Sequence, residues 1–90
     1  MNDLIKNIEK LHTTELGAQR IRKNMGLDET DTVSLCKSYI SMPDAKFQLV
    51  GKNWYVESNN FIFTVNAKSY TIITVKRADK FRRMLSTIEL

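Results

Sequence analysis

One histidine and a group of cations are the side chains of this sequence best suited to chemistry on a phosphate. Imidazole is the one side chain that ordinarily titrates near neutrality, so His12 could serve as base or acid in metal-independent phosphodiester cleavage. Arg20 and Lys76 could hold the phosphate, and Thr74 would add a hydroxyl. His12, Arg20, Thr74 and Lys76 therefore form the candidate catalytic set. This requires the predicted strand at 69–77 to lie beside His12; otherwise His12 is a linker residue bonded to a backbone carbonyl.

The basic residues are unevenly distributed along the chain. The net charge is +4, but residues 1–45 hold six Lys and Arg against seven Asp and Glu, whereas residues 46–90 hold eight against three. A basic C-terminal part is typical of a polyanion-binding surface, although a solvated helix face has the same composition. The predicted nucleic-acid-binding residues are cations and one aromatic that could stack on a base: Arg22, Tyr70, Lys76, Arg77, Lys80, Arg82 and Arg83.

The composition argues against several other classes of protein. The three glycines are isolated, so there is no glycine-rich phosphate loop. One histidine and one cysteine cannot supply a clustered metal site, and we expect no metal and no cofactor. The lone Cys36 excludes an internal disulfide and falls on an apolar helix stripe, which favours a structural role. No apolar run approaches a membrane span of roughly 18 residues and no signal-peptide pattern is present, so we expect a cytoplasmic protein without membrane contact.

Hydrophobic periodicity predicts helices first and strands second. Helices are expected over residues 3–11, from a cap at Thr13 or Thr14 to Gly26, and from Asp28 to before Pro43, with Asp31 three residues on in a capping box. After Pro43 the pattern alternates, which predicts strands at 46–50, from 54, at 61–66 and at 69–77, joined by short turns.

These elements predict one α+β domain over residues 1–90. A helical part at 1–42 packs on one face of a four-stranded antiparallel meander at 45–77, and an amphipathic helix follows at 78–90. Trp54 and Tyr55 are adjacent in a strand, so they must point to opposite faces of the sheet. The one on the uncovered face could stack on a base or contribute to a homodimer.

Several blocks resemble a family of small bacterial proteins of unknown function. They include Leu11-His12-Thr13-Thr14-Glu15-Leu16-Gly17, Gly51-Lys52-Asn53-Trp54-Tyr55-Val56 and Ser69-Tyr70-Thr71-Ile72-Ile73-Thr74, within a match over about residues 4–77. The resemblance implies a small standalone domain and no particular activity. It also implies Ala-His-Lys after Thr74, where this chain has Val75-Lys76-Arg77. A lysine at that histidine position can hold a phosphate but is a poor acid or base near neutral pH.

A second likeness is to the RNase-toxin superfamily, which includes barnase-like, colicin-like and RelE-like nucleases. It is based on the N-terminal histidine, an arginine eight residues on, an antiparallel sheet and a last strand ending in Ile72-Ile73-Thr74. This likeness implies an RNA-cleaving architecture with a Thr in the site.

Three functions remain open from the sequence, and whether the protein is an enzyme is not decided by it. The first is an RNA-acting domain with metal-independent phosphodiester chemistry. The second is a non-enzymatic phage or plasmid inhibitor, of the anti-CRISPR kind, that binds a protein of a host defence or toxin–antitoxin system. The third is a nonspecific nucleic-acid binder whose affinity falls steeply with salt.

Overall fold

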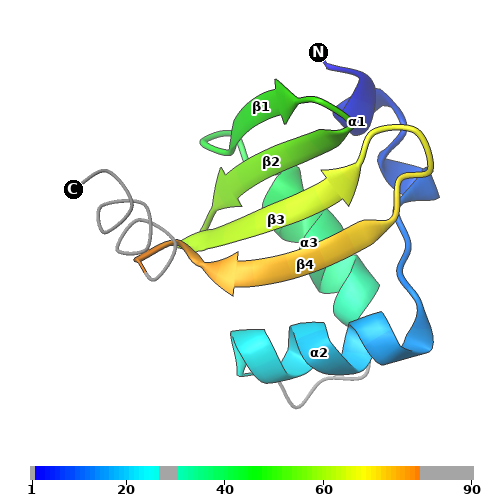
Figure 1. Cartoon of the computed structure of the whole chain (residues 1–90). Helices are drawn as coiled ribbons and strands as arrows, with labels where there is room; N and C mark the ends of the chain where they lie inside the picture. The colour runs from blue at the N-terminus through cyan, green and yellow to red at the C-terminus, as the bar shows by residue number, and fades with distance from the viewer. Residues whose placement is uncertain (1, 27–30, 80–90) are drawn as a thin grey trace.

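The computed structural model describes residues 2–26 and 31–79 of the chain (Figure 1). Within these ranges a helical half precedes an antiparallel sheet, so the fold is α+β, as predicted. The helical elements are α1 (Asp3–Lys6), the 3-10 turn η1 (Ile8–Lys10), α2 (Glu15–Met25) and α3 (Thr32–Ile40). The strands are β1 (Lys46–Val50), β2 (Asn53–Ser58), β3 (Phe61–Asn66) and β4 (Ile72–Arg77). No helix in the described ranges has the length and apolar character needed to cross a membrane.

The helices begin and end at residues that satisfy their terminal backbone groups. Gly26 ends α2 in the left-handed conformation, at φ +69°.

Two predicted boundaries in the helical part were wrong. The helix expected over 3–11 is interrupted at Asn7, which leaves α1 and η1 as separate short elements. The predicted helix start at Asp28 lies outside the described residues, and Asp31, expected three residues into that helix, is instead the N-cap of α3: its carboxylate accepts a 3.2 Å hydrogen bond from the Ser34 amide.

The start of α2 depends on one hydroxyl. Thr14 Oγ1 accepts a hydrogen bond of 2.9 Å from the Gly17 amide, which would otherwise be unpaired at the helix N-terminus. Thr14→Ala is therefore expected to lower the free energy of unfolding by about 1 kcal/mol, measured by urea denaturation. Thr14→Ser keeps the acceptor and should retain most of the stability; an equal loss in both variants would contradict the capping role.

The four described strands form an antiparallel meander in the order β1-β2-β3-β4, as predicted. Figure 1 shows α3 crossing one face of the sheet and α2 running along β4. Pairing in the sheet places Phe47, Val56, Phe63 and Val75 in one row on the helix-covered face. The Ser58 hydroxyl ties that face to α3 by donating a 2.6 Å bond to the Tyr39 carbonyl. The core between sheet and helices comprises Leu4, Leu11, Ile21, Cys36, Ile40, Val56, Phe63, Val65, Ile72 and Val75.

The two adjacent aromatics of β2 point to opposite faces, as the alternation predicted. Trp54 pairs with Val65 on the helix-covered face and packs edge-to-face on Phe47, with ring centroids 6.3 Å apart. Tyr55 pairs with Thr64 on the other side of the strand. Tyr55 is therefore the aromatic that leaves the helix-covered side.

β4 is an edge strand of the sheet. Backbone groups on its open edge form hydrogen bonds with the linker before α2 and with a side chain of α2. The Ile72 amide donates to the His12 carbonyl at 2.7 Å, and the Thr13 hydroxyl donates to the Ile72 carbonyl at 3.1 Å. Asn24 Nδ2 donates to the Val75 carbonyl at 3.0 Å near the other end of α2. These bonds cover an edge that would otherwise offer unpaired groups to another strand.

The last predicted strand and helix differ from expectation or fall outside the description. The strand expected over 69–77 begins only at Ile72, because Tyr70 has a positive φ of 60° that interrupts the extended backbone. The helix expected over 78–90 falls mainly on residues 80–90, which lie outside the described residues. Of its first residues, Ala78 is buried.

Candidate functional site

His12 lies in the extended linker between η1 and α2, directly beside the start of β4. Its backbone forms an isolated parallel bridge with Thr71. The His12 amide donates to the Tyr70 carbonyl at 3.1 Å, and the His12 carbonyl accepts from the Ile72 amide at 2.7 Å. The region of 69–77 therefore does lie next to the histidine, which was the condition for a site there.

The His12 side chain joins a chain of hydrogen bonds. Its Nδ1 is 2.9 Å from the Lys10 carbonyl, and its Nε2 is 3.2 Å from the Thr71 hydroxyl oxygen. That oxygen is in turn 2.8 Å from the Ser69 hydroxyl oxygen. A carbonyl can only accept, so Nδ1 carries a proton, and in the tautomer protonated only there Nε2 accepts from the Thr71 hydroxyl. Thr71 then accepts from Ser69, and the protons point along the series from Ser69 to Thr71 to His12 to the Lys10 carbonyl.

The loop before β4 holds these groups in a strained and well-bonded conformation. The Asn66 side-chain oxygen accepts from the amides of Lys68 and Ser69, both at 2.9 Å. Tyr70 adopts the left-handed region at φ 60°, which costs a non-glycine residue roughly 1–2 kcal/mol. The Lys10 ammonium lies 5.7 Å from the centroid of the Tyr70 ring, within cation–π range. Backbone strain of this kind gathers at functional sites.

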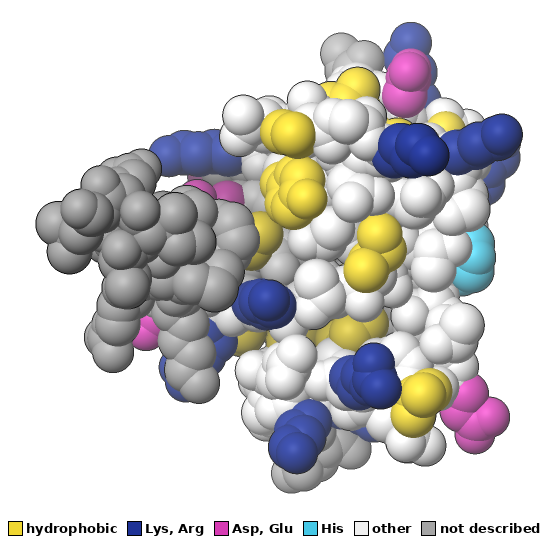
Figure 2. All heavy atoms as spheres, viewed as in Figure 1, with side chains coloured by type: hydrophobic (Ala, Val, Ile, Leu, Met, Phe, Trp, Pro, Cys, Tyr) yellow, Lys and Arg dark blue, Asp and Glu magenta, His cyan; other side chains and the backbone are white. Residues whose placement is uncertain are grey.

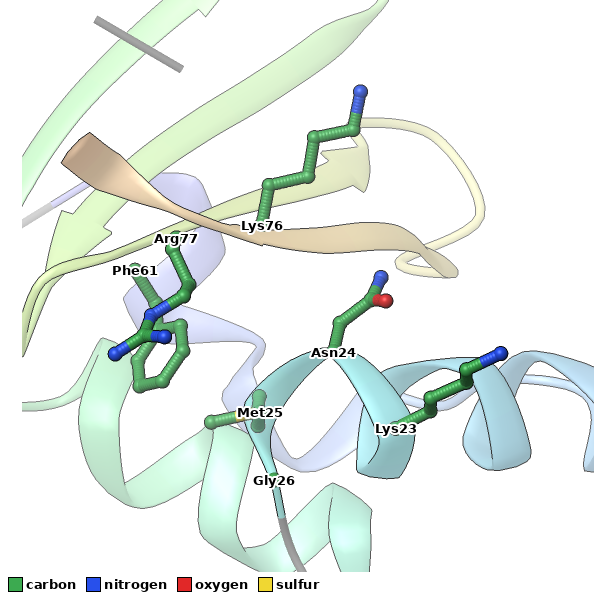
Figure 3. Close-up of a pocket in the computed structure, with 7 residues that line it drawn as sticks. All are labelled: Lys23, Asn24, Met25, Gly26, Phe61, Lys76 and Arg77. Carbon is green, nitrogen blue, oxygen red and sulfur yellow. The ribbon is translucent and has the colours of Figure 1, made fainter. Parts of the chain in front are cut away.

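A second cluster forms a groove at the far end of α2 and β4 (Figure 3). The groove has a volume of about 660 Å³ and is lined by Lys23, Asn24, Met25, Gly26, Phe61, Lys76 and Arg77. Arg77 and Phe61 are cross-strand partners and point the same way, whereas Lys76 extends from the other side of β4. In the space-filling view, Lys and Arg side chains lie over α2 and β4 (Figure 2). Cations around an aromatic wall can hold a phosphate and a planar base.

A family model described as a protein of unknown function, DUF3781, matches residues 5–76. The chain belongs to the DUF3781 family. This confirms the predicted membership of a family without assigned activity and agrees within one residue with the predicted extent of the match. No curated protein and no solved structure matches the DUF3781 chain significantly, so these comparisons give no support to the RNase-toxin likeness.

The predicted catalytic set of the DUF3781 chain is not brought together around one point. His12 contacts Thr71, at the start of β4, whereas Lys76 lies five residues further along, about 16 Å for an extended strand. Arg20 is exposed on α2, between these two ends. Thr74 pairs with Thr64 across the sheet, and the hydroxyl that meets His12 is that of Thr71. The partner of His12 is thus a hydroxyl three residues before the predicted one.

The predicted nucleic-acid-binding residues divide among several places. Lys76 and Arg77 line the groove, and Tyr70 belongs to the His12 cluster. Arg22 is half-buried, and its guanidinium nitrogen Nη1 donates to the Thr32 hydroxyl oxygen at 3.4 Å. This hydrogen bond links α2 to α3. The other three residues, Lys80, Arg82 and Arg83, lie outside the described residues.

Sequence reasoning missed Thr71 at one site and Lys23 and Phe61 at the other. Nothing local in the sequence marks which hydroxyl of residues 69–77 meets His12. Lys23 lies three residues before Gly26, so its place at the end of α2 was available as a signal. Among the described residues, no group of three or more His, Cys, Asp and Glu is placed to hold a metal ion.

Proposed function

We propose that this DUF3781 protein binds single-stranded RNA through the groove between α2 and β4. The observation that carries the proposal is that three cations from α2 and β4 line one groove together with the Phe61 ring: Lys23, Lys76 and Arg77. The cations would neutralise phosphates and release their counterions. The half-buried Phe61 ring would stack on a base in a way that tolerates any sequence.

Single-stranded RNA suits the groove better than a duplex does. A stacking ring inside a hollow needs an unpaired base that can be turned outward, and the bases of a duplex are already paired and stacked. Asn24 adds an amide to the lining of the groove, and its nitrogen donates to the Val75 carbonyl. The exposed Arg20 continues the basic surface along α2.

The test is a titration of a fluorescently labelled RNA 12-mer followed by anisotropy over a range of salt concentrations. The triple variant Lys23→Ala, Lys76→Ala and Arg77→Ala should lose affinity at low salt. Its slope of log affinity against log salt should be shallower by about 2, at roughly 0.7 per phosphate contact on a single strand.

Two further variants make the result specific to the groove. Phe61→Leu should weaken binding by about 1–3 kcal/mol, the value of one stacked base, with the salt slope unchanged. A triple variant at exposed lysines away from the groove, Lys6→Ala, Lys46→Ala and Lys52→Ala, removes the same charge and should bind much more tightly than the groove variant. Equal binding by the two triple variants, or a flat salt response of the unchanged protein, would refute the proposal.

The proposal concerns binding and assigns no cleavage residue to the groove. Metal-independent cleavage would require an acid–base group at the bound phosphate, and His12 lies beside the other end of β4. The same RNA incubated without metal and separated on a denaturing gel provides the check. We expect it to remain intact with the unchanged protein and with His12→Ala alike.

A further inference from the structure

We propose that Thr71 is a nucleophilic hydroxyl, activated by His12, that accepts an acyl group from an ester. This inference uses no residue of the RNA-binding groove and does not depend on the proposed function. It concerns Ser69, Thr71, His12 and the Lys10 carbonyl, which are joined in one series of hydrogen bonds.

The arrangement has the three parts that an activated nucleophile needs. The Thr71 hydroxyl is the nucleophile, and His12 Nε2, 3.2 Å away, is placed to take its proton. The third part is the Lys10 carbonyl, which accepts from Nδ1 at 2.9 Å and thereby fixes both the ring orientation and the tautomer. Without that bond the ring could turn and present a protonated nitrogen to Thr71.

The surroundings of Thr71 leave the reacting atoms accessible to a substrate. His12 and Ser69 are exposed, and Thr71 is half-buried. The preceding residue, Tyr70, is held in the left-handed conformation, and the Asn66 side chain fixes the loop by bonding the amides of Lys68 and Ser69. The nucleophile therefore stands directly after a strained turn, on a rigid support.

The chemistry of the site favours an ester carbonyl over a phosphodiester. The Lys10 ammonium lies over the Tyr70 ring beside this site, whereas three cations line the groove. Transfer of a phosphoryl group relies on several cations that stabilise the negative charge of the phosphoryl oxygens in the transition state. A neutral ester needs mainly a base and a hydrogen-bond donor for its carbonyl oxygen, and the Ser69 hydroxyl can turn from Thr71 to that oxygen.

The step can be written in full. Thr71 Oγ1 bonds to the ester carbonyl carbon while its proton passes to His12 Nε2. The bond from carbon to the leaving oxygen then breaks, and that oxygen leaves with the proton from His12 as an alcohol. The product is an acyl ester on Thr71. Water then attacks its carbonyl carbon while its proton passes to His12 Nε2, and the Thr71 oxygen leaves with that proton as a carboxylic acid is released.

The experiment measures covalent labelling of the whole protein by a fluorophosphonate probe and by p-nitrophenyl acetate, with peptide mass spectrometry to locate the adduct. The adduct is expected on Thr71, and Thr71→Val should abolish it whereas Thr71→Ser should keep it. His12→Gln retains a hydrogen-bonding side chain but no base, so it should slow labelling at least 100-fold.

Ser38→Ala removes an exposed hydroxyl on α3 and should label like the unchanged protein. Circular dichroism of each variant verifies the fold. Absence of an adduct in the folded protein, an adduct elsewhere than Thr71, or an unchanged labelling rate in folded His12→Gln would overturn the proposal.

Discussion

Replacing Phe63 with alanine is expected to lower the free energy of unfolding by about 3–5 kcal/mol. Phe63 is fully buried in the middle strand pair, between Val56 of β2 and Val75 of β4. Its ring also packs edge-on against Tyr39 of α3, with centroids 6.2 Å apart. Truncation would leave a cavity exactly where sheet and helix meet, and a domain of this size has a total stability of only about 5–13 kcal/mol. Urea denaturation followed by circular dichroism measures the loss.

A matched variant on the same face separates burial from aromatic character. Phe47→Ala removes the same ring from β1, where Phe47 is only half-buried and contacts Trp54. Its loss should be clearly smaller, because less apolar surface is returned to water and the edge can relax around the gap. Equal losses in the two variants would mean that Phe63 is not the centre of the core.

The Cys36 thiol is expected to react with iodoacetamide far more slowly in the folded protein than in the unfolded chain. Burial raises the pKa of Cys36 from its ordinary value of 9.0 to about 12. Because the thiolate is the reactive form, its fraction at pH 8 falls on the order of a thousandfold. Mass spectrometry of alkylated protein with and without urea provides the comparison. Similar rates in the two conditions would contradict the buried position on α3.

The same burial predicts a loss of stability in alkali. Between pH 9 and about 12 the unfolded chain has released the thiol proton while the folded protein still holds it. The folded state therefore binds more protons in this window, and the contribution of Cys36 to stability decreases as the pH rises. Cys36→Ala lacks this proton, so its stability deficit relative to the unchanged protein should shrink from pH 8 to pH 10.5. Parallel pH profiles would be inconsistent with the raised pKa.

Much of the fold could be predicted because its signals are local. The predicted cap at Thr13 or Thr14, observed at Thr14, and the stop at Gly26 bound α2 correctly, and the alternation through Trp54 and Tyr55 predicted the two faces of β2. The break in the first helix at Asn7 could not be read in this way, since Leu4, Ile5, Ile8 and Leu11 keep a helical spacing across it. Between α1 and η1 the backbone conformation is determined by how these apolar residues pack in the core and not by their spacing in the sequence.

The candidate site was predicted only in part, for the same reason. His12 and the segment before Thr74 were both identified, but the hydroxyl that meets the imidazole depends on where the linker crosses β4. Tyr70 is left-handed, β4 begins only at Ile72, and the linker meets the chain between them, at Thr71. No pattern near either residue encodes a contact between positions 59 residues apart.

The contact between His12 and Thr71 also determines when the proposed nucleophile and its base can meet during synthesis of the chain. The bridge between His12 and Thr71 joins the linker between η1 and α2 to the residue that precedes β4. A nascent chain that has emerged only as far as β3 already contains His12 but has nothing for it to activate. The long loop must close before the hydroxyl and the imidazole meet, and its closure is among the slower and more entropically costly steps of folding. His12 can therefore activate the proposed nucleophile, Thr71, only after the two segments have come together in the folded domain.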